Sequence, residues 1–185
     1  MEKITVTALI KAEKHKVWEY YTNPDHIINW NFADPSWHCP KATNEIRIGG
    51  KYFARMEAKD GSFGFDYIAI YTELKVGSNF TYEFAGRTVN VSFIEKNEQT
   101  EVIITFDPET ENSLELQRNG WQAILNNLKN ILRLTKKIKQ HITACGRQPA
   151  LFDNFPIFRG GPAGAHTRNV LCHFENLLYN SKLNH

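Results

Sequence analysis

The residues best suited to chemistry are an adjacent His–Cys pair and a glutamate on a predicted strand. A His beside a Cys, as at His38 and Cys39, can activate a thiolate nucleophile. Neighbouring side chains in an extended chain point to opposite sides, however, so this pair is poorly placed to interact and structural packing is the simpler interpretation. His38 and Glu57 remain candidates for an acid or a base, although neither stands in a recognisable catalytic motif.

Arg55 and Glu57 lie two residues apart, so in a strand they share one face, together with Phe53. If that face is inward, the charges are buried and must pair or bind a polar ligand group. If it is outward, they form an ordinary surface pair worth about 0–1 kcal/mol. Both alternatives stay open, and Asp66 has the same ambiguity.

Motifs for cofactors and metals are absent from the sequence. There is no serine nucleophile motif, no P-loop and no Rossmann glycine set. Gly49-Gly50 precedes a predicted strand and indicates a turn or bulge. A metal site built from His38, Cys39 and a histidine of the C-terminal tail would match no known ligand spacing. We therefore expect neither a cofactor nor a metal.

The more informative pattern is the number of aromatic residues along the predicted strands and helices. Ligand sites are typically apolar and aromatic with a few polar anchors, whereas the alternative is that these rings simply fill the core. The predicted ligand-binding residues are Trp30, Phe32, Trp37, Phe53, Arg55, Phe65, Tyr67, Tyr82, Phe84, Trp121, Leu125 and Leu128. Tyr71 lies on the same strands and belongs to the same aromatic set.

A long amphipathic helix is predicted over residues 112–137. Its apolar residues recur at helical spacing and form one stripe: Trp121, Ile124, Leu125, Leu128, Ile131 and Leu132. Asn112 is the expected N-cap, with Glu115 three residues later as in a capping box. A mid-helix glycine costs about 1 kcal/mol relative to alanine, so we expect another element or a ligand to approach the backbone at Gly120.

The remaining elements are predicted strands and two short helices. Alternation over residues 4–10 indicates a strand, and residues 15–21 and 25–30 indicate short helices. Residues 31–41 contain two prolines, which exclude a regular central strand. About six antiparallel strands follow, over residues 45–48, 51–58, 64–74, 80–84, 88–94 and 101–106, with a hairpin turn at Asp60-Gly61. This order predicts an α+β fold with helices on one face of an antiparallel sheet.

Four short motifs in this order resemble the activator of Hsp90 ATPase homologue 1-like (AHSA1-like) branch of the SRPBCC (Bet v 1-like, START-like) superfamily. They are Val17-Trp18 with Thr22-Asn23-Pro24-Asp25-His26-Ile27 and Trp30; Ile48-Gly49-Gly50-Lys51-Tyr52-Phe53; Met56 with Asp60-Gly61; and Gly120-Trp121 with Leu125 and Leu128. The resemblance covers residues 1 to about 137. It implies a helix-grip fold, in which a curved sheet wraps around the long C-terminal helix, usually with an apolar cavity between them. It implies no particular reaction.

Composition divides the chain into a family-like part, residues 1–138, and a C-terminal extension, residues 139–185, which has a higher proportion of Pro, Gly and His. The extension is interpreted as loosely attached; the alternative is a packed lid or dimerising arm. The charged, alternating N-terminus is unlike a signal peptide, and three cysteines without a CxxC motif favour a reducing cytoplasm. No apolar run is long enough for a membrane span.

Three functions are compatible with these observations. The leading hypothesis is a binding protein for a small hydrophobic or amphipathic molecule. The first alternative is an enzyme that uses the same cavity for acid–base, hydrolase or cyclase chemistry, and the second is a chaperone-interacting, Hsp90 co-chaperone-like module. A protein partner or a homodimer would fit the last. Nucleic acid is disfavoured as a partner because residues 1–138 are slightly acidic.

Overall fold

The computed structural model describes residues 2–144, which form one antiparallel sheet, two short helices and one long helix. The elements in chain order are β1 (Ile4–Ile10), α1 (Lys14–Thr22), α2 (Pro24–Ile27), β2 (Trp37–Asn44), β3 (Lys51–Ala58), β4 (Gly64–Lys75), β5 (Asn79–Phe84), β6 (Arg87–Lys96), β7 (Gln99–Phe106) and α3 (Leu114–Ala144). The predicted boundary at residue 138 falls within α3, and the C-terminal extension beyond residue 144 lies outside the described residues.

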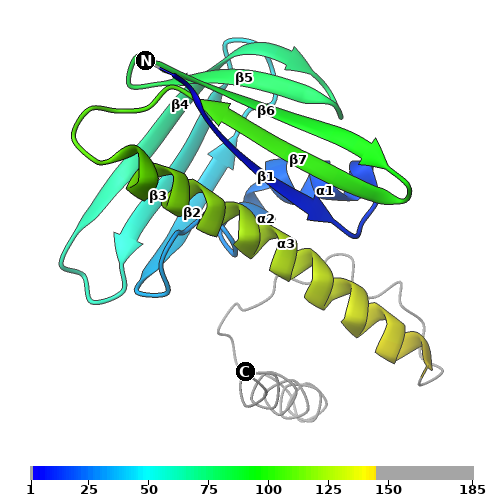
Figure 1. Ribbon diagram of the computed structural model, residues 1–185. Coiled ribbons are helices and arrows are strands. Elements are labelled where there is room, and N and C mark those ends of the chain that lie inside the picture. Colours follow the sequence, from blue (N-terminus) through cyan, green and yellow to red (C-terminus); the bar gives the residue numbers. More distant parts are fainter. Residues whose placement is uncertain (1, 145–185) are drawn as a thin grey trace. The chain divides into compact units, whose positions relative to one another are not determined.

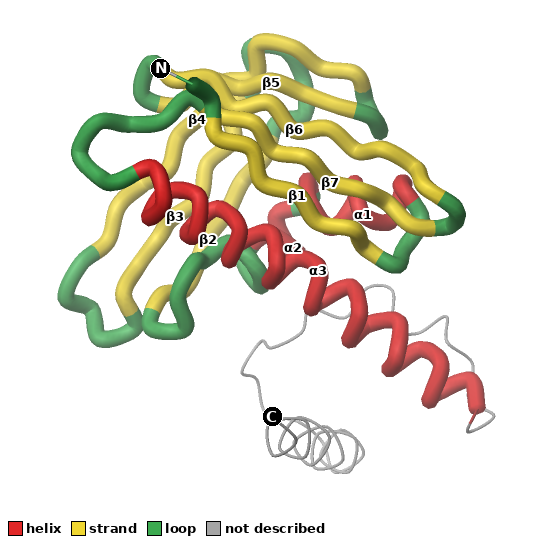
Figure 2. Tube along the Cα trace, viewed as in Figure 1, coloured by secondary structure: helices red, strands yellow, loops and turns green. Residues whose placement is uncertain are grey.

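The seven strands form one curled antiparallel sheet with the order β1-β7-β6-β5-β4-β3-β2. Successive strands from β2 to β7 pair as hairpins, and β1 returns to pair with β7 in the register Ile4 with Phe106. The helix α3 crosses the concave side of this sheet beside β1, and α1 and α2 lie at one end (Figure 1; Figure 2). This confirms the α+β class predicted from the order of the elements and the helix-grip arrangement that the family resemblance implied.

Alternation of apolar residues places the core between the sheet and α3. In β1 the residues Ile4, Val6, Ala8 and Ile10 are buried and the residues between them are exposed. The stripe of α3 supplies Leu125, Leu128 and Leu132, which are also buried. Because one face of each strand and one stripe of the helix are apolar, both bury those faces against each other. The curvature of the sheet then decides how much space remains between them.

The start of α3 differs from the prediction by one residue. The helix begins at Leu114, and the hydroxyl of Ser113 accepts the backbone N–H of Leu116 at 3.2 Å, which makes Ser113 the N-cap rather than Asn112. The capping box with Glu115 is therefore wrong. The backbone N–H of Asn112 donates instead to the carboxylate of Glu109, at 3.0 Å.

The expectation that another element approaches Gly120 closely is also wrong. A Cβ added to Gly120 would meet nothing within 4 Å. Gly50, by contrast, is required by its surroundings, since an added Cβ would lie 2.1 Å from the carbonyl oxygen of Glu45. Together with the positive φ of 73° at Gly49, this confirms the turn predicted at Gly49-Gly50.

The strand predicted over residues 45–48 is wrong, and a strand was missed at Trp37–Asn44. That strand, β2, is the edge of the sheet, with its register broken between His38 and Lys41. Pro40 lies within this irregularity, where its missing N–H costs no ladder bond. The hairpin at Asp60-Gly61 is confirmed between β3 and β4. In the described part of the chain, no helix is long and apolar enough to cross a membrane.

Candidate ligand-binding site

A pocket of about 250 Å³ lies between the inner face of the sheet and the first half of α3. It is contacted by residues from α1, the segment after α2, five strands, the β7–α3 loop and α3. Its lining consists of Tyr21, Trp30, Asn31, Tyr52, Met56, Phe65, Tyr67, Tyr71, Phe80, Tyr82, Phe84, Arg87, Val89, Ile104, Phe106, Asp107, Glu109, Gln117, Trp121 and Ile124. Most of these side chains are aromatic or aliphatic.

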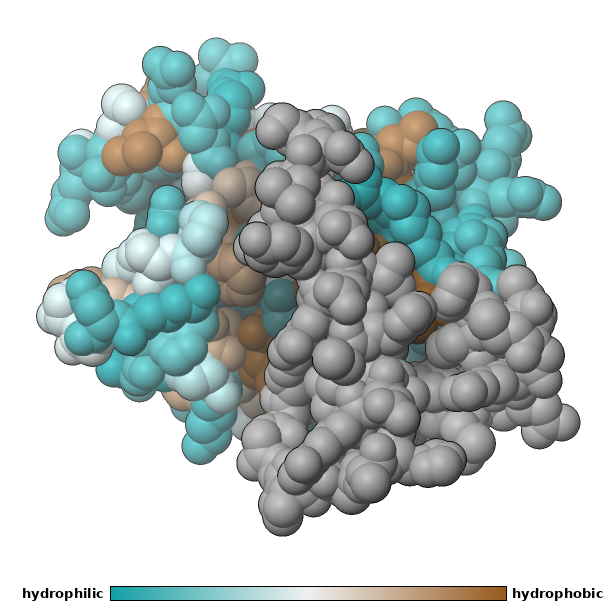
Figure 3. Space-filling model, turned by 90° about the horizontal axis from the view of Figure 1, so that it is seen from below, coloured by the Kyte–Doolittle hydropathy of each residue, from teal (hydrophilic) through white to brown (hydrophobic). Residues whose placement is uncertain are grey.

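The aromatic rings of the pocket are packed against each other in pairs. Tyr67 and Phe84 stack with ring centres 3.9 Å apart. Phe106 and Trp121 stack at 4.6 Å, which joins β7 to α3. Such contacts are worth about 0.5–1.5 kcal/mol beyond the burial itself. The rings therefore hold one another as the wall of the pocket instead of collapsing into it. In the view from below, brown, apolar residues are visible behind the teal and white residues at the surface (Figure 3).

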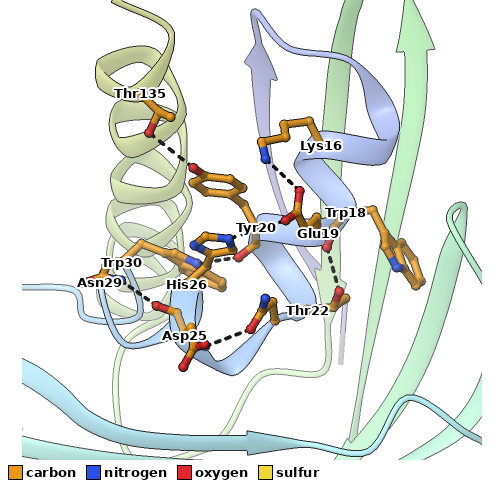
Figure 4. Close-up of polar contacts among 11 residues, drawn as sticks. Lys16, Trp18, Glu19, Tyr20, Thr22, Asp25, His26, Asn29, Trp30 and Thr135 are labelled. Atoms are coloured by element: carbon orange, nitrogen blue, oxygen red, sulfur yellow. Dashed lines mark hydrogen bonds and ion pairs between the residues drawn. The ribbon is translucent and has the colours of Figure 1, made fainter. Parts of the chain in front are cut away.

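The corner formed by α1 and α2 fixes Trp30 at one end of the pocket. The indole N–H of Trp30 donates to the carbonyl of Tyr20 at 2.9 Å. The ring of Tyr20 stacks on His26 at 3.8 Å, and its hydroxyl donates to Thr135 of α3 (Figure 4). Asn23 caps α2 by accepting the N–H of Asp25. Local capping and one cross-contact to α3 thus set the orientation of the Trp30 ring.

Tyrosine hydroxyls supply part of the polar character of the pocket. The hydroxyl of Tyr71 donates to Asn44 at 2.9 Å, and burial raises its pKa to about 12. The hydroxyl of Tyr52 accepts from Asn31 at 3.1 Å. Burial also raises the pKa of Tyr52 and Tyr82 well above the ordinary value. These phenols therefore stay protonated and act as hydrogen-bond donors or acceptors, never as anions, at neutral pH.

Tyr67 is the exception among these tyrosines. Its ring is half-buried, but its hydroxyl oxygen is enclosed. Burial raises the pKa of Tyr67, and the Tyr82 hydroxyl is near enough to influence it, yet no hydrogen bond of ordinary geometry joins the two oxygens. The Tyr67 hydroxyl is thus the one enclosed side-chain polar atom without a partner among the described residues.

The other polar residues gather where β6 begins, β7 ends and α3 starts. Asp107 accepts from the side chain and backbone of Thr88 and pairs with Lys3 at 3.0 Å; these contacts lower the pKa of Asp107 to about 2. Glu109 accepts from the N–H groups of Glu111 and Asn112, which lower its pKa. Gln117 is bonded to the backbone of Glu109. Arg87 lies beside them, with its guanidinium 5.4 Å from the ring centre of Phe84.

Six of the predicted ligand-binding residues line this pocket together, as does Tyr71 from the same aromatic set: Trp30, Phe65, Tyr67, Tyr82, Phe84 and Trp121. Leu125 and Leu128 belong to the buried face of α3 and are fully buried, but they do not line the pocket. Their contribution is to the core that holds α3 on the sheet.

The other predicted residues lie elsewhere. Phe53 and Arg55 are on the outer face of β3, because Tyr52, Ala54 and Met56 occupy the inner face. Arg55 pairs there with Glu57 at 2.8 Å and with Asp66 at 3.1 Å, which settles the open question of their face. Phe32 packs against the edge of the core. Trp37, on β2, contacts the ring of Phe65 on β4. The proposed lining of the pocket therefore no longer includes Phe32, Trp37, Phe53 and Arg55.

The candidates for catalysis are also separated from the pocket. His38 lies 3.6 Å from Glu57 on the partly exposed edge of the sheet, and neither residue lines the pocket. Burial raises the pKa of the Cys39 thiol to about 11, so it is protonated and a poor nucleophile. Within residues 2–144, no group of three or more His, Cys, Asp and Glu could hold a metal ion.

Sequence reasoning missed the polar end of the pocket and several of its rings. Tyr52 and Met56 were passed over because both faces of β3 are fairly apolar. Arg87 follows the Ala85-Gly86 turn, and alternation from the buried Val89 could have placed it inward. Asp107 and Glu109 carried no signal, since loops are positioned by tertiary contacts. Gln117 lies in the first turn of α3 but is polar, so the apolar stripe did not include it.

Comparison with known proteins assigns the chain to one family. Residues 11–133 match the family described as activator of Hsp90 ATPase homolog 1-like protein. The solution structure of an AHSA1-like protein from Aeromonas hydrophila is 34% identical, with a TM-score of 0.65 over 78% of this chain and 94% of that chain. A protein from Cytophaga hutchinsonii is 40% identical, with a TM-score of 0.64 over 73% and 94%.

A third solved structure shows how far the fold extends beyond sequence likeness. A Nitrosomonas europaea protein is 15% identical, with a TM-score of 0.63 over 74% of this chain and 97% of that chain; this likeness concerns the fold alone. No curated protein matches the chain. Because the family match covers residues 11–133 and the Aeromonas and Cytophaga proteins are 34% and 40% identical, the chain belongs to the activator of Hsp90 ATPase homolog 1-like family.

Proposed function

We propose that this protein binds a small apolar or amphipathic molecule in the pocket between the sheet and α3. The observation that carries the proposal is the pocket itself, about 250 Å³ and walled mainly by aromatic rings. Ligand sites are concave, mostly apolar and aromatic, with few polar groups. The volume lies just below the roughly 300–1,000 Å³ common for such sites, so the ligand is small, on the scale of one or two fused rings.

The pocket is not simply a defect of core packing. Interiors are close-packed, and an unfilled space costs stability in proportion to its volume. Here large rings surround the space, and pairs such as Phe106 and Trp121 are stacked on its wall instead of filling it. Space of this size, maintained by rings that pack against each other, is explained by a ligand that occupies it.

The test is a matched pair of substitutions on β7. Ile104 lines the pocket, whereas its neighbour Ile103 points to the other face of the strand. Ile104→Phe should fill the pocket and weaken binding of a neutral probe, naphthalene-2-methanol, by at least about tenfold, because the ligand and the new ring need the same space. Binding is followed by isothermal titration calorimetry.

Ile103→Phe is the control and should leave the affinity unchanged. Circular dichroism of both variants establishes that each retains the fold. The proposal fails if wild-type protein shows no saturable binding, or if a folded Ile104→Phe variant binds as tightly as wild type. The enzymatic and chaperone-interacting alternatives, a homodimer and the expected cytoplasmic location all stay predictions from the sequence.

A further inference from the structure

Arg87 is the one charged group at the pocket whose side chain makes no polar contact within residues 2–144. Its guanidinium forms no ion pair or hydrogen bond there and rests only over the ring of Phe84, 5.4 Å from the ring centre. The residue is half-buried, so part of its hydration is already lost. A half-buried guanidinium with five free donors is a ready site for an acceptor.

The neighbouring polar groups are already engaged. Asp107 is held by Thr88 and Lys3, and Lys3 balances its charge at 3.0 Å. Glu109 is held by two backbone N–H groups at the start of α3, and Gln117 is used on the backbone of the same loop. These residues build the rim and leave Arg87 as its unmatched member.

The second unmatched polar group of the pocket is also a donor. The Tyr67 hydroxyl has no partner, and Tyr67 stacks on Phe84, the same ring that Arg87 covers. Because the Tyr67 oxygen is enclosed and Arg87 is only half-buried, Arg87 is the more accessible of the two donors. Both groups lack an acceptor, so a complementary ligand must bring acceptor oxygens to this end of the pocket.

We propose that the ligand is a small ring-containing carboxylate, with its ring between the aromatic walls and its carboxylate on the guanidinium of Arg87. This inference rests on the proposed function and specifies its ligand class. The planar guanidinium matches a carboxylate in two parallel hydrogen bonds, which are stronger than neutral ones. Phe84 beneath the guanidinium limits its freedom, so less entropy is lost when the pair forms.

The charge of Glu109 is the main competitor for Arg87. Arg87 contributes to the lowered pKa of Glu109, so the two charges attract each other, but they are not in contact. Coulomb energy falls with distance, and a ligand carboxylate at hydrogen-bond distance therefore interacts more strongly with Arg87 than Glu109 does. Binding of the acid should weaken as salt is raised, because the rim is open to solvent.

The experiment compares three probes that share one ring system: naphthalene-2-carboxylate, naphthalene-2-methanol and naphthalene-2-methylamine. Dissociation constants are measured at neutral pH for wild type, Arg87→Gln and Arg47→Gln. Arg47 is exposed, does not line the pocket and pairs with Glu45 at 2.7 Å, so its substitution removes the same charge away from the site. Wild type should bind the carboxylate about tenfold more tightly than the alcohol, and the amine most weakly.

Arg87→Gln should abolish the preference for the carboxylate while leaving the affinity for the alcohol within about twofold, and Arg47→Gln should change neither. If the alcohol binds wild type as tightly as the acid, or if Arg87→Gln keeps the preference, the carboxylate proposal is overturned while the binding function stands. If no probe binds, both proposals fall together. Circular dichroism of Arg87→Gln shows that any loss is not a loss of fold.

Discussion

At the scale of single residues, the unpaired hydroxyl of Tyr67 lowers the stability of the ligand-free protein but offers a hydrogen-bond donor at the pocket. An enclosed hydroxyl without a partner costs about 1–3 kcal/mol, and such costs are tolerated where function needs the group. Tyr71 lies four residues away on the same face of β4, but its hydroxyl is paired with Asn44. The two tyrosines are therefore a matched pair that differ in whether the hydroxyl is satisfied.

Removing each hydroxyl should shift the free energy of unfolding in opposite directions. Tyr67→Phe should stabilise the ligand-free protein by up to about 1 kcal/mol, because an unpaired polar group is lost. Tyr71→Phe should destabilise it by about 1–2 kcal/mol, because the bond to Asn44 is broken and the Asn44 oxygen loses its donor. Urea denaturation measures both; a Tyr67→Phe variant as unstable as Tyr71→Phe would show that the Tyr67 hydroxyl is satisfied.

At the scale of elements, two glycines show which backbone positions are constrained. Gly120 lies within α3 facing open space, whereas Gly50 lies against the carbonyl oxygens of Glu45 and Arg47. Glycine weakens a helix through its conformational freedom, and nothing in its surroundings requires it at position 120. The β2–β3 connection, in contrast, closes only because residue 50 has no side chain.

Alanine substitutions should therefore separate the two glycines clearly. Gly120→Ala should raise the free energy of unfolding by about 1 kcal/mol. Gly50→Ala should lower it by an amount near the top of the roughly 0.5–3 kcal/mol usual for single substitutions, since a Cβ there would lie 2.1 Å from a backbone oxygen. Thermal or urea unfolding checks both, and a destabilising Gly120→Ala would restore the discarded idea of a close approach to that residue.

The same elements show why sequence reasoning succeeded in some places and not in others. The stripe of α3 and the alternation of β1 and β7 could be predicted because burial of one face imposes a local period. The edge strand β2 was missed because Pro40 and the irregular register conceal it. Ser113 and Asn112 are equally good caps in sequence, and only the bond that the Ser113 hydroxyl accepts from the N–H of Leu116 decides between them.

At the scale of the whole molecule, the pocket follows from a curved sheet that one helix crosses without filling its hollow. Trp121 is the centre of this arrangement, because it stacks on Phe106 and lines the pocket at the same time. Its presence in the pocket could be predicted from the helical stripe. The polar rim could not, since Arg87, Asp107 and Glu109 meet only when β6, β7 and the start of α3 are folded together.

The central claim is that a small molecule occupies the space beneath α3. The most direct measurement is an NMR titration of isotope-labelled protein with naphthalene-2-carboxylate, in which intermolecular nuclear Overhauser effects locate the ligand. The account predicts contacts from the naphthalene protons to the rings of Trp121, Phe106 and Phe84. Contacts confined to the outer face of the sheet, around Phe53 or Ile68, or saturable binding without any contact to these three rings, would contradict it.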